Sequence, residues 1–275
     1  MMDYGQFLGF EGIRLYWQRW LPKTEKIKAV VVFMHGGNNY SSLPYIQNIA
    51  DKLTDAGYAL YAYDQRGFGR SEGIRMHMDR WEQVRADMKA FLHLVKKNHP
   101  DLPVYAFGVS FGAAQTFDQA IVSPFLLDGI IIGGFSLIPL DVPMKSLLML
   151  LGKLFPRVKM PADVPESFPG AKEKMQGTDL WKDPLCPETM TFGNFTVLIT
   201  RQASYQDECQ FVSLPVLHLQ GAQDTIAKPD PSLITKLASE DVTYKVYDNA
   251  NHDLFNSPDA DKIVVDVIRW LDDRT

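Results

Sequence analysis

Cysteine is scarce in this chain of 275 residues, which holds only Cys186 and Cys209. Two thiols so far apart in the sequence make neither a disulfide framework nor a zinc site, because such sites need ligands at short paired spacings. The sequence therefore predicts a reduced cytoplasmic protein, with a single disulfide between the two thiols as the alternative.

The chain also lacks long apolar runs and basic regions. Its longest apolar cluster, Leu147 to Leu151, is far shorter than the roughly 20 residues of a membrane-spanning helix. The N-terminal MMDYGQFLGFEG has no cationic segment followed by an apolar stretch, so we expect no signal peptide. The net charge is -5 and the Lys and Arg residues are scattered, so we expect no nucleic-acid partner. Hydrophobic residues make up 46% and charged residues 22%, which excludes a disordered chain.

What the sequence does contain is an alternation of buried strands with amphipathic helices. Apolar runs typical of strands covered on both faces are Ala29 to Met34, Leu60 to Tyr63, Val104 to Phe107, Gly129 to Ile132 and Val216 to Leu219. Apolar residues spaced three and four apart predict helices over Tyr45 to Leu53, Met78 to Lys97 and Ile263 to Leu271. This order predicts a mostly parallel sheet flanked by helices, in one main domain.

Two half-buried strands precede this alternation. Tyr4 to Phe10 and Ile13 to Trp20 alternate in polarity and are joined through Glu11 and Gly12, as in an antiparallel hairpin. No G-x-G-x-x-G follows the first buried strand, which disfavours a dinucleotide-binding fold. A hairpin followed by a doubly wound sheet predicts the α/β-hydrolase fold.

The alternation stops between Phe135 and Leu214. This stretch has no valine-rich strand and much proline, and its clearest helix-like piece is Met144 to Phe155, while Val197 to Thr200 is compatible with strand or helix. Long insertions in compact domains are usually functional. We therefore interpret residues 135–214 as a helical cap inserted into a core of residues 1–134 and 215–275, with an ordinary helical excursion as the alternative.

A serine stands where one of the buried strands ends. The sequence GVSFG at residues 108–112 matches G-x-S-x-G, and a helix-compatible run, Ala113 to Ala120, follows it. A tight strand-to-helix turn of this kind lifts the serine above the sheet edge and aims the N-terminus of the helix at it. The pattern predicts Ser110 as a nucleophile, and a turn that merely contains serine is the alternative.

A serine nucleophile needs a histidine base and an acid that holds the base, and in this fold they follow in the order serine, acid, histidine. His218 lies inside a predicted strand, whereas His252 lies in a polar loop after the strand-like Tyr244 to Tyr247, so we predict His252 as the base. Asp224 follows a predicted strand and a glycine turn, which places its carboxylate at the same sheet edge. The rival aspartates are Asp207 in the insertion, Asp230 between two prolines and Asp248 beside the histidine loop.

Acyl transfer also needs donors for the negatively charged oxygen of the tetrahedral intermediate. The first buried strand ends in the sequence HGG at residues 35–37, a loop whose backbone can turn an N–H toward the serine. We predict the N–H groups of Gly37 and Phe111 as these donors and assign His35 to organising the loop. A site composed in this way uses no metal ion or cofactor.

Together these motifs resemble the monoacylglycerol lipase and lysophospholipase branch of the serine α/β hydrolases, which is similar to the serine aminopeptidases. The resemblance covers nearly the whole chain and rests on HGG at 35–37, YDQRGFGRSEG at 63–73, GVSFG at 108–112, LGKLFP at 151–156, GAQD at 221–224 with Pro229 to Ser232, and NHDL at 251–254. It implies a triad of Ser110, Asp224 and His252, an oxyanion hole at Gly37 and Phe111, and a bracing role for the D-x-x-G-x-G-x-S loop. The chain departs from the family at Val109, where histidine is usual, and at Asn249, where glycine is usual.

The apolar helix of the insertion suggests a substrate. Met144 to Phe155 is apolar on all sides, so one face would line an acyl tunnel through Leu148, Leu151 and Phe155 while another meets lipid or a partner. We therefore hypothesise a single-chain lipid ester, either a monoacylglycerol or a lysophospholipid, and a peripheral membrane contact through the cap.

Three other functions remain open at this point. One is a short-chain carboxylesterase, and another is an aminopeptidase-like hydrolase in which Glu166, Glu173 or Asp179 holds the substrate amine. The third is a catalytically inactive binding protein of the same fold. The sequence makes no prediction of the oligomeric state.

Overall fold

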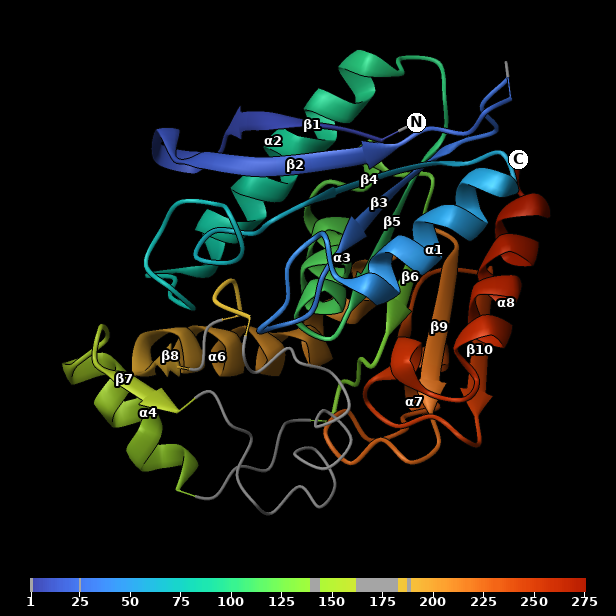
Figure 1. Ribbon diagram of the computed structural model, residues 1–275. Helices are drawn as coiled ribbons and strands as arrows, with labels where there is room; N and C mark the ends of the chain where they lie inside the picture. The colour runs from blue at the N-terminus through green and yellow to red at the C-terminus, as the bar shows by residue number, and fades with distance from the viewer. Residues whose placement is uncertain (1, 25, 139–143, 162–182, 187–188) are drawn as a thin grey trace.

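The computed structural model describes residues 2–24, 26–138, 144–161, 183–186 and 189–275. At its centre is an eight-stranded sheet with the order β1-β2-β4-β3-β5-β6-β9-β10 (Figure 1). The hairpin strands β1 (Met2–Leu8) and β2 (Arg14–Trp20) are antiparallel to each other, and β2 is antiparallel to β4 (Ala59–Tyr63). All other neighbours in this sheet are parallel. The predicted α/β-hydrolase fold is therefore confirmed.

The remaining strands and the flanking helices lie close to their predicted bounds. The other strands of the sheet are β3 (Val30–Met34), β5 (Val104–Val109), β6 (Gly129–Gly133), β9 (Val216–Gly221) and β10 (Val242–Tyr247). The helices beside them are α1 (Pro44–Asp55), α2 (Trp81–Asn98), α3 (Phe111–Val122), α7 (Ser232–Lys236) and α8 (Ala260–Asp272). Only the five-residue α7 was not predicted.

Successive residues of β3 point into two separate cores. Val30, Val32 and Met34 pack with side chains of α2 and α3. Val31 and Phe33 pack with side chains of α1 and α8 on the opposite face. Because the side chains of a strand alternate between faces, a strand covered on both sides must be apolar at every position, which is why this one reads as an unbroken apolar run.

A buried ion pair ties the N-terminal hairpin to this core. Asp87 of α2 accepts two hydrogen bonds from the guanidinium of Arg66, at 2.5 and 2.9 Å, and both side chains are buried. The same carboxylate accepts the N–H of Phe10, at 2.7 Å, in the turn η1 (Phe10–Gly12) that joins the two hairpin strands. The hairpin turn is thus fixed to α2 and to the loop that follows β4.

The described helices of residues 135–214 lie below α2 and α3, at the lower left of Figure 1. They include α4 (Lys145–Leu154) and α6 (Phe192–Glu208). The two helices approach closely at Gly152, where a β-carbon would lie only 2.0 Å from the hydroxyl of Thr196. Glycine is therefore required at this crossing.

Two features of the insertion differ from, or go beyond, what the sequence indicated. Short strands β7 (Lys159–Pro161) and β8 (Thr189–Thr191) pair antiparallel, although no strand was expected here. They contain no valine, so a search for apolar runs passes over them. Val197 to Thr200, left open as strand or helix, lies within α6. The Thr191 hydroxyl caps this helix by accepting the N–H of Asn194 at 3.1 Å.

A buried network fixes α6 to the core. Arg201 of α6 donates to Asp118 of α3 at 2.6 Å, and Arg85 of α2 donates to the same carboxylate at 2.7 and 2.9 Å. The hydroxyl of Tyr205 donates to the carbonyl oxygen of Ala114 at 2.8 Å. Since both contacts on α3 lie within the helix that follows Ser110, α6 is tied directly to the element that carries the candidate site.

Both cysteines are buried free thiols. Cys186 packs in the core that contains α1 and α8, and Cys209 packs in the core on the other face of the sheet. The alternative of a disulfide between them is therefore not realised. Among the described residues, no helix has both the length and the apolar character needed to cross a membrane.

Candidate active site

Ser110 occupies a strained turn between β5 and α3. Its backbone has φ 53° and ψ -115°, a region that residues other than glycine rarely adopt. A β-carbon on Gly108 would lie 2.2 Å from the carbonyl oxygen of Gly112, and one on Gly112 would lie 2.1 Å from that of Met34. Only glycine fits either position. The Ser110 N–H donates to the carbonyl oxygen of Gly133 at 2.8 Å, which fixes the turn to the neighbouring strand β6.

The structure brings the serine, the histidine and the aspartate singled out from the sequence into contact. Ser110 Oγ lies 2.8 Å from His252 Nε2, and His252 Nδ1 lies 2.9 Å from Asp224 Oδ2. A carboxylate only accepts hydrogen bonds, so Nδ1 carries the proton, and Nε2 of the neutral ring accepts the serine hydroxyl. This arrangement can move the hydroxyl proton from Ser110 to His252.

Asp224 is held by four hydrogen bonds. Its side chain has no exposed area. Oδ1 accepts the N–H groups of Ile226 and Ala227, each at 2.9 Å. Oδ2 accepts His252 Nδ1 and, at 3.1 Å, the side-chain amide of Gln220. These donors replace the water that a buried carboxylate loses.

Two further glycines allow the loops of the site to meet. A β-carbon on Gly221, at the end of β9, would lie 2.4 Å from the carbonyl oxygen of Asn251. One on Gly134, where φ is 59°, would lie 3.3 Å from His252 Cε1 and Nδ1. The sequence patterns did not single out Gly134 or Gln220. Gly134 could have been found from the glycine pair that follows the predicted strand Gly129 to Ile132. Gln220 could have been found as a polar side chain directly after the predicted strand Val216 to Leu219.

Gly37 and Phe111 lie beside each other and beside the serine. A β-carbon on Gly37 would be 3.9 Å from Cβ of Phe111, and one on the preceding Gly36 would be 3.6 Å from Cβ of Ser110. Phe111 is the first residue of α3, so its N–H has no partner within the helix. Gly37 is exposed. Two backbone segments therefore border the position where an oxyanion would form.

Both ring nitrogens of His35, the histidine that begins this loop, form hydrogen bonds. His35 Nδ1 donates to the carbonyl oxygen of Gly36 at 2.8 Å, and its Nε2 accepts the N–H of Gln65 at 3.1 Å. The amide of Gln65 donates in turn to the carbonyl oxygen of His35 at 2.7 Å. Burial lowers the pKa of His35, so the ring stays neutral. The ring organises the loop, in agreement with the role assigned from the sequence.

The D-x-x-G-x-G-x-S loop contacts the same segment through Asp64. Its Oδ1 accepts the N–H and the hydroxyl of Ser41, at 2.7 and 2.6 Å. Its Oδ2 accepts the N–H of Arg70 at 2.8 Å. The carboxylate is fully buried. Through these hydrogen bonds it joins the loop after β4 to the segment that follows Gly37.

Comparison with known proteins agrees with this geometry. The family model described as serine aminopeptidase, S33, matches residues 25–259. The chain belongs to this family. It is 27% identical to the monoacylglycerol lipase of Mycolicibacterium smegmatis, over 96% of this chain and 95% of that protein. It is 31% identical to the caffeoylshikimate esterase of Arabidopsis thaliana, over 95% of this chain and 82% of that protein.

Solved structures share the fold of this S33 family member. A soluble variant of the monoglyceride lipase of Saccharomyces cerevisiae, in complex with a substrate analog, superposes with a TM-score of 0.83 at 24% identity, over 99% of this chain and 95% of that one. The monoacylglycerol lipase of Paleococcus ferrophilus superposes with a TM-score of 0.81 at 22% identity, over 95% of this chain and 99% of that one. At these identities the structural similarity shows a shared fold and nothing further.

In this S33 hydrolase, the residues considered as alternatives for the base and the acid lie in other environments. His218 is buried in β9, its Nε2 donates to the carbonyl oxygen of Phe135 at 2.9 Å, and burial lowers its pKa to about 4. Asp230 accepts the N–H of Ser232 at 3.0 Å and is also buried. Asp207 and Asp248 are exposed. The carboxylate that contacts His252 Nδ1 is that of Asp224.

The residues proposed for an acyl tunnel all lie on or beside α4. Leu148 and Leu151 are half-buried, whereas Phe155, which follows the helix, is 54% exposed. The acidic residues named for the aminopeptidase alternative, Glu166, Glu173 and Asp179, lie outside the described residues.

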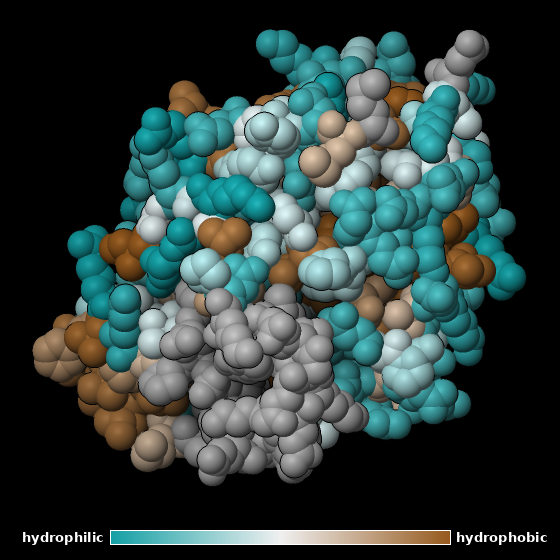
Figure 2. Space-filling view, viewed as in Figure 1, coloured by the Kyte–Doolittle hydropathy of each residue, from teal (hydrophilic) through white to brown (hydrophobic). Residues whose placement is uncertain are grey.

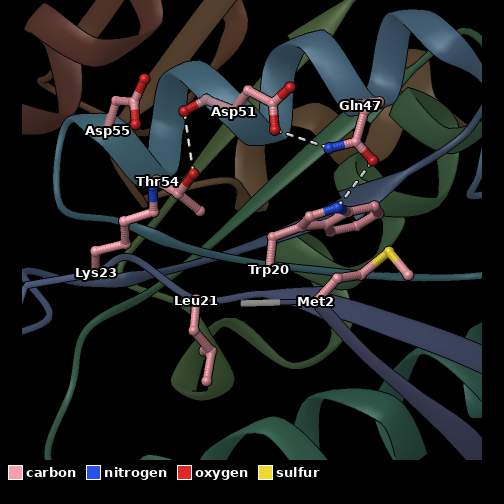
Figure 3. Close-up of a pocket in the computed structure, with 8 residues that line it drawn as sticks. All are labelled: Met2, Trp20, Leu21, Lys23, Gln47, Asp51, Thr54 and Asp55. Atoms are coloured by element: carbon pink, nitrogen blue, oxygen red, sulfur yellow. Dashed lines mark hydrogen bonds between the residues drawn. The ribbon is translucent and has the colours of Figure 1, made fainter.

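A surface pocket of about 460 Å³ lies at the opposite edge of the sheet (Figure 3). Its lining includes Trp20 at the end of β2 and Gln47 and Asp51 of α1. Trp20 pairs with Leu60 near the start of β4, so the pocket is at the amino ends of the parallel strands. Trp20 Nε1 donates to Gln47 Oε1 at 3.0 Å, and Gln47 Nε2 donates to Asp51 Oδ1 at 2.8 Å. These polar groups bond to one another rather than surround a nucleophile, so the candidate site remains at Ser110.

Proposed function

We propose that this hydrolase cleaves carboxylic esters of single-chain lipids, of the monoacylglycerol or lysophospholipid type. The observation that carries the proposal is the hydrogen-bonded chain from Ser110 through His252 to Asp224 in an α/β-hydrolase fold. Relatives named monoacylglycerol lipase and monoglyceride lipase, matched over nearly all of this chain, support the choice of a glycerol ester. The apolar helix of the insertion supports a lipid acyl group.

The proposed reaction proceeds through an acyl-enzyme. Ser110 Oγ attacks the ester carbonyl carbon while His252 Nε2 takes the hydroxyl proton. The N–H groups of Gly37 and Phe111 stabilise the negative oxygen of the tetrahedral intermediate. The C–O bond to the alcohol then breaks, His252 returns its proton to the alcohol oxygen, and the acyl group remains on Ser110. A water molecule that gives its proton to His252 releases the fatty acid by the same steps, while Asp224 orients the ring and stabilises its charged form.

In this proposal residues 135–214 form a lid over the core of residues 1–134 and 215–275. The position of α4 and α6 below α2 and α3 supports this division (Figure 1). Leu148, Leu151 and Phe155 would line the channel that receives the acyl chain. Burial of each methylene contributes about 0.8 kcal/mol, so such a channel favours longer chains.

The expected result is therefore a kcat/KM for p-nitrophenyl octanoate at least about tenfold above that for the acetate, since several buried methylenes separate the two acyl groups. The measurement is a chain-length series of these esters. Monoacylglycerols, lysophospholipids, a caffeoyl ester and aminoacyl amides complete the substrate panel.

Each alternative function has its own outcome in this panel. Acetate hydrolysed as fast as octanoate would favour a short-chain carboxylesterase, and preferred cleavage of an aminoacyl amide would favour the aminopeptidase-like hydrolase. A folded wild-type protein that hydrolyses nothing and is not labelled by a fluorophosphonate would favour the inactive binding protein.

We also propose that α4 makes a peripheral membrane contact. Figure 2 shows hydrophobic side chains gathered at the lower left, over the region that α4 occupies in Figure 1. Exposed apolar side chains of α4 and of the residue that precedes it are Met144 at 69%, Leu147 at 48%, Leu150 at 51% and Leu154 at 60%. Their spacing of three and four residues places them on one side of the helix. An exposed apolar helix face of this kind can insert into the interface of a lipid layer.

The double substitution Leu147→Glu and Leu150→Glu is expected to weaken binding to phosphatidylcholine vesicles by about tenfold or more, because two apolar side chains no longer enter the lipid. Hydrolysis of a dispersed short-chain ester should not change. Vesicle co-sedimentation measures the first effect. The matched control is Phe125→Glu, since Phe125 is 72% exposed in η2 (Pro124–Leu126), ahead of β6 at the amino edge of the sheet. Equal vesicle binding by the wild type and the double variant would contradict the contact.

A further inference from the structure

A glutamine lies directly behind the acid of the candidate triad. Gln220 is the penultimate residue of β9 and has no exposed area. Neighbouring positions of the strand are apolar, and a polar side chain buried at such a place needs partners that satisfy it. The partners of its amide nitrogen connect it to the site.

The two N–H groups of the Gln220 amide are directed at the turn that carries the acid. Nε2 donates to Asp224 Oδ2 at 3.1 Å and to the carbonyl oxygen of Ala227 at 2.8 Å. Both of these oxygens can only accept, which fixes the orientation of the amide. Ala227 also donates its own N–H to Asp224 Oδ1 at 2.9 Å. The amide therefore bonds to both the carboxylate and the segment that holds it.

The two carboxylate oxygens of Asp224 are held differently. Oδ1 is bonded to two backbone N–H groups, those of Ile226 and Ala227. Oδ2 is bonded to two side chains, His252 and Gln220. Without Gln220, and as far as the described part of the chain shows, the oxygen that orients the histidine would be held by the histidine alone. An acid that must fix a ring needs a support independent of that ring.

We infer that Gln220 is a positioning residue for the reaction, which holds Asp224 Oδ2 in line with His252 Nδ1. This inference rests on the proposed function, because it assigns Asp224 to orienting the base. Gln220 touches neither the substrate nor the reacting atoms and acts through the carboxylate alone.

The test replaces the amide with an apolar side chain of similar length. Gln220→Met is expected to lower kcat for p-nitrophenyl butyrate by about tenfold, because a hydrogen bond to a charged group is lost, with KM changed less than about twofold. The matched control is Gln119→Met in α3. Gln119 is fully buried, and its amide has no partner among the described residues, so this substitution should leave kcat unchanged.

A double-mutant cycle with Asp224→Asn separates positioning from a general structural effect. If Gln220 acts through the carboxylate, Gln220→Met should have no further effect on kcat in the Asp224→Asn background. A merely structural role would lower kcat by the same factor in both backgrounds. Equal factors would overturn the inference.

The pH profile provides a second readout. The amide N–H directed at Asp224 offsets part of the negative charge that stabilises protonated His252. Its removal should therefore move the acidic limb of the kcat/KM profile to higher pH by about half a unit or more. Loss of folded protein would lower the whole profile without moving the limb, so an unmoved limb would also count against the inference.

Gln220→Asn covers the case in which the methionine variant does not fold. It keeps an amide in the pocket but is one methylene too short to reach Asp224 Oδ2, so the same losses are expected.

Rates of labelling by a fluorophosphonate distinguish the proposed function from the inference about Gln220. A wild type that is neither labelled nor active contradicts the proposed function together with this inference. A wild type labelled no faster than both Gln220 variants contradicts the inference alone.

Discussion

Replacement of Ser110 by alanine is expected to lower kcat by about 10⁶-fold, the scale of loss when the nucleophile of a serine hydrolase is removed. The residual rate would come from the oxyanion donors and from substrate binding. Alanine occupies the same strained backbone, with φ 53°, so the melting temperature should stay close to that of the wild type. Hydrolysis of p-nitrophenyl butyrate and labelling by a fluorophosphonate measure the effect.

Ser213→Ala serves as the matched control, since Ser213 is an exposed serine in the loop before β9. It should retain both activity and labelling. Persistent labelling of the Ser110→Ala variant would identify a different nucleophile and would remove the basis of the proposed mechanism.

Asp224→Asn is expected to lower kcat by about 10⁴-fold while KM changes little. An asparagine side chain can present an N–H to His252 Nδ1, which would then accept, so that Nε2 carries the proton. In that tautomer Nε2 cannot take the proton of Ser110. Steady-state kinetics on the same ester measures the loss.

Asp230→Asn is the control for this prediction. Asp230 is buried to a similar extent and also receives hydrogen bonds, from the N–H and hydroxyl of Ser232, but it does not contact His252. Its substitution should leave kcat within a few-fold of the wild type. Similar losses in the two variants would show that Asp224 has no special relation to the base.

The sheet could be predicted from the sequence because burial on both faces leaves a local pattern. The residues of β3 read as an unbroken apolar run, and a short run of that kind is typical of a strand covered on both sides. The choice of Asp224 and His252 followed from the serine, acid, histidine order of this fold and from the position of each residue after a predicted strand. The structure brings Ser110, Asp224 and His252 into hydrogen-bond contact, although their catalytic roles remain proposals.

Other features depend on contacts between distant segments and leave no local pattern. Gln220 looks like an isolated polar residue near the end of a strand, and only the fold shows that it reaches Asp224. Gly134 is favoured by its positive φ of 59° and by His252, from the far end of the chain, which packs against it. The strands β7 and β8 contain mainly Lys, Met and Thr, so they lack the valine-rich apolar run by which the strands of the main sheet were found.

The distance along the chain between Ser110 and His252 has a consequence for biosynthesis. The two residues are 142 positions apart, and both the acid and the base follow the insertion. A ribosome that has completed β6 has made Ser110 and the loop of Gly37, but not Asp224 and His252, the proposed acid and base. Contacts of such long range form late in folding. If these roles hold, a nascent chain that ends before β9 is expected to be inactive toward esters, and the appearance of activity during refolding would report the completion of the last strands.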